Sequence, residues 1–74
     1  MKTLYVEWGS GEMVSYYVGK GYKAHEYKTC FTLDSFSGTY TFDKRTKKVT
    51  LDTGAEVREV AVKHWEESEI DWMD

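Results

Sequence analysis

Three side chains in this sequence could together support catalysis or bind a metal ion: Cys30, His25 and His64. A thiol needs an adjacent base or cation to be largely ionised at neutral pH, and most structural zinc sites use several cysteines. Neither pattern is present around Cys30, the only cysteine, which lies between Thr29 and Phe31 in a predicted strand. We therefore expect a half-buried structural cysteine with two ordinary histidines. The sequence predicts no catalytic residue, no metal site, no cofactor and no enzymatic activity.

Two glycines flank a lysine at Gly19-Lys20-Gly21, a composition that resembles a phosphate-binding loop. A Walker loop needs a longer glycine frame that ends in Lys-Ser or Lys-Thr, and a dinucleotide fingerprint needs a third glycine. Because the segment meets neither requirement, we expect it to be a connection between strands and not an anion site.

Four basic residues lie close together in a predicted loop: Lys44, Arg45, Lys47 and Lys48. Proteins that bind single-stranded nucleic acid combine a cationic groove with exposed aromatic side chains. This cluster therefore supports an alternative function, a small single-stranded nucleic-acid-binding or nucleotide-binding β-domain. However, the nearby aromatic rings share the predicted inward face, and the net charge of −3 opposes affinity for phosphates. A basic hairpin tip is most often a solvated turn that also protects a sheet edge.

The C-terminal segment, residues 64–74, is acidic and also carries large apolar side chains. Aromatic anchors surrounded by charged groups are typical of protein interfaces. In a second interpretation the tryptophans cover the open face of a small sheet, and the two are compatible if Trp65 packs inward and Trp72 outward. The predicted partner-binding residues are Trp65, Glu66, Glu67, Glu69, Ile70, Asp71 and Trp72.

A compact acidic domain without catalytic residues is suited to blocking another protein. We expect a binding or inhibitor module, encoded by a phage or mobile element, that disables a host or defence protein in an anti-CRISPR-like role. The expected partner is a larger protein with a basic nucleic-acid-binding groove, blocked by occlusion or by acidic phosphate mimicry.

The size and composition predict one domain over residues 1–74. A single free thiol is typical of a reducing compartment. We expect no signal peptide, and the sequence has no run of about 20 apolar residues. These features predict a cytoplasmic protein that does not cross a membrane.

Alternating apolar residues predict how the chain is organised. Residues 3–8 and 13–18 read as two strands around a glycine-rich turn, and residues 29–51 read as an antiparallel meander. Residues 22–28 receive no assignment. The expected fold is mostly β: a small antiparallel sheet or partly open barrel of five or six strands.

The segment from Ala55 onward is ambiguous. Val60 and Val62 alternate as in a strand, but Val57, Ala61 and Trp65 also fit a helical stripe. We favour a strand through about Val62 and keep as the alternative an α+β fold with a C-terminal helix. The expected core is Leu4, Val6, Trp8, Val14, Tyr16, Val18, Phe31, Leu33, Tyr40, Phe42, Val49, Leu51, Val60 and Val62.

Overall fold

The computed structural model describes residues 2–69, and within them the chain forms strands joined by turns. The expected mostly β, antiparallel fold is confirmed. The strands are β1 (Lys2–Trp8), β2 (Met13–Tyr17), β3 (Ala24–Glu26), β4 (Cys30–Ser35), β5 (Gly38–Asp43), β6 (Val49–Asp52), β7 (Val57–Glu59) and β8 (Val62–Glu69).

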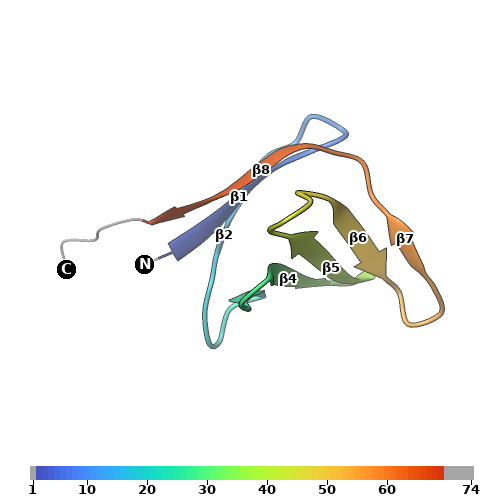
Figure 1. Ribbon diagram of the computed structural model, residues 1–74, viewed down its shortest axis with the longest axis horizontal. Coiled ribbons are helices and arrows are strands. Elements are labelled where there is room, and N and C mark those ends of the chain that lie inside the picture. Colours follow the sequence, from blue (N-terminus) through green and yellow to red (C-terminus); the bar gives the residue numbers. More distant parts are fainter. Residues whose placement is uncertain (1, 70–74) are drawn as a thin grey trace.

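These strands form two sheets rather than one (Figure 1). The first sheet has the order β2-β1-β8, and the second is a meander with the order β3-β4-β5-β6-β7. On one side the chain passes from one sheet to the other between β7 and β8. On the other side the two sheets meet through a single parallel bridge between Val18 and Ala24.

The helix considered for the segment after Ala55 is absent from residues 55–69, because β7 and β8 occupy that part of the chain. The register of β8 on β1 explains the ambiguous pattern. His64 is opposite Glu7 and Val62 is opposite Trp8, so Lys63 is an extra residue without a partner. A bulge of this kind reverses which side chains of the strand face the core. Val62 and Trp65, three positions apart in the sequence, therefore both face the core. The expected five or six strands are too few for residues 2–69, since residues 22–28 contain β3 and the segment after Ala55 forms two strands, β7 and β8.

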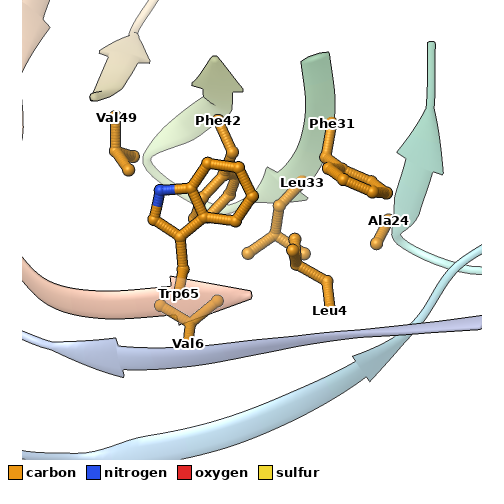
Figure 2. Close-up of a cluster of buried hydrophobic side chains, with 8 residues drawn as sticks. All are labelled: Leu4, Val6, Ala24, Phe31, Leu33, Phe42, Val49 and Trp65. Atoms are coloured by element: carbon orange, nitrogen blue, oxygen red, sulfur yellow. The ribbon is translucent and has the colours of Figure 1, made fainter. Parts of the chain in front are cut away.

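The core lies between the two sheets and receives side chains from both (Figure 2). Trp65 of β8 packs edge-on against Phe42, with ring centroids 5.4 Å apart, and against Phe31 at 6.1 Å. Aromatic pairs in this geometry stabilise a fold beyond the area they bury. The buried hydrophobic residues are Leu4, Val6, Ala24, Phe31, Leu33, Phe42, Val49, Leu51 and Trp65.

Most of the predicted core is confirmed. Seven of its residues are buried, and Val14 is half-buried. Ala24 and Trp65 are buried although the sequence pattern did not include them. Six further residues are partly exposed and pack against the core: Trp8, Tyr16, Val18, Tyr40, Val60 and Val62.

Two glycines permit close approaches that shape the molecule. A Cβ on Gly9 would lie 2.8 Å from the carbonyl oxygen of Ala61, and the Gly9 N–H donates to that oxygen at 3.2 Å. This contact holds the tip of the β1–β2 hairpin against the link between β7 and β8. Gly38 has a φ of 136°, and a Cβ there would overlap the carbonyl oxygen of Asp52. Glycine is therefore required where β5 passes β6.

Candidate functional site

A groove of about 900 Å³ opens between the first sheet and the β4–β5 hairpin. One bank is formed by the β1–β2 hairpin, including Glu12 and Tyr16. The opposite bank is formed by the end of β4 and the turn that follows it, including Asp34 and Phe36. A volume of this size is at the upper end of the range of about 300–1,000 Å³ for ligand pockets.

Aromatic rings form the floor of the groove. The rings of Trp8 and Tyr40 are in contact, with centroids 4.9 Å apart and planes inclined by 55°. The Trp8 indole N–H donates to the hydroxyl oxygen of Tyr16 at 3.3 Å. Trp8 also contacts Phe42 of the core, with centroids 6.3 Å apart. The floor is thus ordered by packing and by a hydrogen bond, so little entropy is lost when a ligand covers it.

At the rim, Phe36 occupies the two-residue turn between β4 and β5 and is fully exposed. No core contact explains a phenylalanine at this position. An exposed aromatic ring beside an apolar groove is typical of a binding surface, since its burial by a ligand would remove apolar area from water.

Three charged residues also line the groove: Glu12, Asp34 and Lys23. Within residues 2–69, the carboxylates of Glu12 and Asp34 make no hydrogen bond or ion pair. They are available to a ligand and, together with Lys23, give the groove one net negative charge.

The predicted C-terminal site is only partly supported by the positions of its residues. Trp65 is 4% exposed, so the prediction that it contacts a partner is wrong: its ring fills the core between the sheets. Glu66, Glu67 and Glu69 are exposed on β8. Glu66 lies 3.1 Å from the His64 imidazole, and Glu67 lies 3.0 Å from the ammonium of Lys2. Ile70, Asp71 and Trp72 lie outside the described residues.

Lys2 also belongs to a chain of ion pairs that joins the two sheets. Its ammonium lies 3.0 Å from Glu26 of β3, and Glu26 accepts from Lys44 at 2.8 Å. The hydrogen bond from Lys44, and next the one from Lys2, lowers the pKa of the Glu26 carboxyl. The hydrogen bonds to Glu26 and Glu67 raise the pKa of Lys2. These charges therefore stabilise the contact between the sheets.

The predicted basic cluster is divided by the fold. The ammonium of Lys44 lies 4.8 Å from the centroid of the Phe31 ring and is paired with Glu26. Lys47 contacts Trp65. Only Arg45 and Lys48 extend from this loop without an internal ion pair or ring contact within residues 2–69. The cluster does not form a continuous cationic groove.

Cys30, His25 and His64 lie on three different strands, β4, β3 and β8. Among residues 2–69, no three His, Cys, Asp or Glu side chains lie close enough to hold a metal ion. The Gly19-Lys20-Gly21 segment lines a separate hollow of about 430 Å³.

Comparison of the chain with known protein families, with characterised proteins and with solved structures finds no match in any of the three. The part of the chain that the structure describes contains no helix long and apolar enough to cross a membrane.

The sequence pattern did not identify the groove as a site. Its floor residues Trp8, Tyr16 and Tyr40 were predicted as core, because they share the inward face of their strands. The one signal in the sequence was Phe36, a large aromatic residue within the turn-forming run Asp34-Ser35-Phe36-Ser37-Gly38.

Proposed function

We propose that this chain is a small protein-binding domain that holds an extended segment of a larger protein in the groove between its sheets. The observation that carries this proposal is the aromatic floor, where Trp8, Tyr16 and Tyr40 stay partly exposed beside a closed core. Tryptophan and tyrosine dominate the energetics of protein interfaces because they bury large areas at a low cost in conformational entropy.

The inhibitor role expected from the sequence is one form of this proposal. A domain that holds a segment of its partner also covers the surface around that segment, and so blocks access to it. Mimicry of phosphate charge would depend instead on the carboxylates of β8. Glu66 and Glu67 already have partners within the protein, His64 and Lys2. The groove therefore supports the binding of a partner better than these carboxylates do. Encoding by a phage or mobile element stays part of the proposal, and genomic context would test it.

The test compares two exposed aromatic residues. Proteins captured from a lysate by the immobilised chain are identified, purified and titrated by calorimetry against Phe36→Ala and Tyr27→Ala. Both side chains are exposed, but only Phe36 lines the groove. We expect Phe36→Ala to weaken binding about thirtyfold, the scale of an interface hot spot of ~2 kcal/mol. The control Tyr27→Ala should leave the affinity unchanged.

The opposite pattern would contradict the proposal. If Phe36→Ala binds as the parent does while Glu66→Lys loses affinity, the contact lies on β8 and not in the groove.

A further inference from the structure

We propose that the partner segment binds as an additional β-strand on the free edge of β2, with a lysine or arginine side chain facing the carboxylates of the groove. This inference rests on the proposed function, and it adds the backbone geometry and the chemistry of the bound segment.

The backbone groups that are free on β2 follow from the two hydrogen bonds that flank its pairing with β1. The N–H of Trp8 donates to the oxygen of Glu12 at 2.8 Å, and the N–H of Val18 donates to the oxygen of Lys2 at 3.1 Å. Hydrogen-bonded and non-bonded pairs alternate along an antiparallel ladder. The even-numbered residues of β2 therefore bond to β1, and the odd-numbered residues direct their N–H and C=O groups to the opposite side.

Within residues 2–69, the backbone of β2 pairs on that opposite side only at its end, through the bridge between Val18 and Ala24. Within residues 2–69, Met13 and Ser15 make no backbone hydrogen bond on this side. These two residues can exchange hydrogen bonds with an extended segment, which is the mode of recognition called β-augmentation.

The composition of β2 differs from that of a protected edge strand. Folded proteins protect their sheet edges with charged side chains, proline or very short strands. β8, the other edge of the same sheet, carries several charged residues, and its Trp65 carbonyl accepts a hydrogen bond from the Lys47 ammonium at 3.2 Å. β2 has five residues, none of them charged and none a proline. The edges β3 and β7 of the second sheet have three residues each.

The groove adjoins this edge, because Tyr16 of β2 lines it together with Trp8 of β1. Side chains of a strand point alternately to the two faces of its sheet. Every second side chain of a segment added to β2 would therefore face the aromatic floor. Phe36 on the opposite bank would cover the segment from the other side.

The charges of the groove decide which side chain the segment offers. Glu12 and Asp34 present two carboxylates against the single Lys23, so a cation is favoured at this place. A cation within about 6 Å of an aromatic ring also gains from the ring quadrupole, and arginine uses this contact most often. The protein forms such a contact internally, where the Lys47 ammonium lies 3.7 Å from the centroid of the Trp65 ring.

A second copy of this chain fits the site less well than a basic segment does. Its own free edge, Met13–Tyr17, contains no lysine or arginine that could face Glu12 and Asp34. Pairing between two β2 strands would leave these carboxylates without a counter-ion. We therefore assign the groove to a different protein.

The test selects peptides of about eight residues from a random displayed library on the immobilised full chain. We expect the binders to contain lysine or arginine within an alternating, β-branched pattern. Addition of a selected peptide should slow the amide hydrogen exchange of Met13 and Ser15 at least about tenfold, because their N–H groups become bonded. The double variant Glu12→Gln, Asp34→Asn should weaken binding at least about tenfold. The matched control Glu59→Gln, an exposed acid outside the groove, should not.

Each remaining outcome overturns the inference in a recognisable way. Peptides without a basic residue that still depend on Phe36 would leave the proposed function intact and refute the assigned chemistry. Bound peptides that leave the exchange of Met13 and Ser15 unchanged would refute strand addition alone. Protection of the same amides without peptide, in a concentration-dependent dimer, would assign the edge to a second copy. Protection by an oligonucleotide would assign it to nucleic acid. A selection that yields no binder would overturn both this inference and the proposed function.

Discussion

Lys47 and Trp65 are joined by two reciprocal hydrogen bonds between the loop after β5 and strand β8. The Lys47 ammonium donates to the carbonyl oxygen of Trp65 at 3.2 Å, and the Trp65 indole N–H donates to the carbonyl oxygen of Lys47 at 3.1 Å. The backbone of Lys47 has a φ of 65°, a conformation that disfavours residues with a Cβ. The contacts with Trp65 offset this cost and attach the loop of one sheet to the other.

The first prediction concerns Trp65. Trp65→Ala should lower the free energy of unfolding by about 3–5 kcal/mol, because it opens a cavity beside Phe31 and Phe42. Trp65→Phe keeps most of the ring but leaves the Lys47 carbonyl without its donor, which should cost roughly 1–3 kcal/mol. Urea denaturation measures both. The control Val57→Ala, at an exposed position, should change stability by no more than about 0.5 kcal/mol. Equal stabilities for all three variants would contradict the buried position of Trp65.

The second prediction concerns the acid dependence of stability. Lys44 and Lys2 hold the pKa of Glu26 below its ordinary value of 4.5. A carboxyl with a lowered folded-state pKa stabilises the fold above its unfolded value, and the contribution is lost as the pH falls through the folded value. Glu26→Gln should therefore reduce stability at neutral pH and flatten its decline below about pH 4.5. Denaturation midpoints measured across this range test it.

The variant should not abolish the acid dependence completely, since the backbone hydrogen bonds from Thr46 and Arg45 also lower the pKa of Asp43. Lys2 contributes a pH dependence of stability with the opposite sign. Its raised pKa stabilises the fold below the ordinary value of 10.5, and this contribution is lost as the pH rises through the folded value. An acid profile that is identical in Glu26→Gln and in the parent would show that Glu26 is not coupled to folding.

The third prediction compares two glycines with positive φ. Gly54 has open space where a Cβ would lie, so Gly54→Ala should cost only the backbone strain of about 1–2 kcal/mol. At Gly38 a Cβ would also overlap the Asp52 carbonyl oxygen, so Gly38→Ala must in addition shift β5 away from β6. We expect a clearly lower melting temperature for Gly38→Ala. An equal loss of stability in both variants would show that β5 and β6 move apart at Gly38 with no further cost in free energy.

The fourth prediction addresses nucleic acid. Because Lys44 and Lys47 are held by contacts within the protein, the predicted basic cluster keeps only Arg45 and Lys48 for phosphates. We expect filter-binding titrations with a single-stranded oligonucleotide to give a dissociation constant no tighter than about 1 µM, with retention lost at moderate salt. Tight binding that disappears in the double variant Arg45→Ala, Lys48→Ala would instead support the nucleic-acid-binding alternative.

Local alternation was enough to predict much of this fold. In β1, β4, β5 and β6, inward residues such as Leu4, Phe31 and Phe42 follow a period of two, and a strand with one buried face must have that period. Turn-forming residues separated these strands in the sequence. The antiparallel meander and its core face therefore follow from properties of short segments.

The alternating pattern failed to predict a core residue where pairing between distant segments of the chain shifted the register of a strand. The bulge at Lys63 arises from the pairing of β8 with β1, which lies more than fifty residues earlier in the chain. It reverses which of the later β8 residues face the core, so Trp65 enters the core against the pattern of Val60 and Val62. A bulge of this kind leaves no local signature, because it depends on how the partner strand is placed.

The groove depended still more on tertiary structure. The sequence determined that Trp8, Tyr16 and Tyr40 face inward, since each follows the period of its own strand. It could not determine that a groove opens between the first sheet and the β4–β5 hairpin, which leaves these rings partly exposed. Whether an inward side chain is covered depends on the packing of one sheet on the other. That packing is a property of the whole chain, and it alone converts a predicted core face into a candidate binding site.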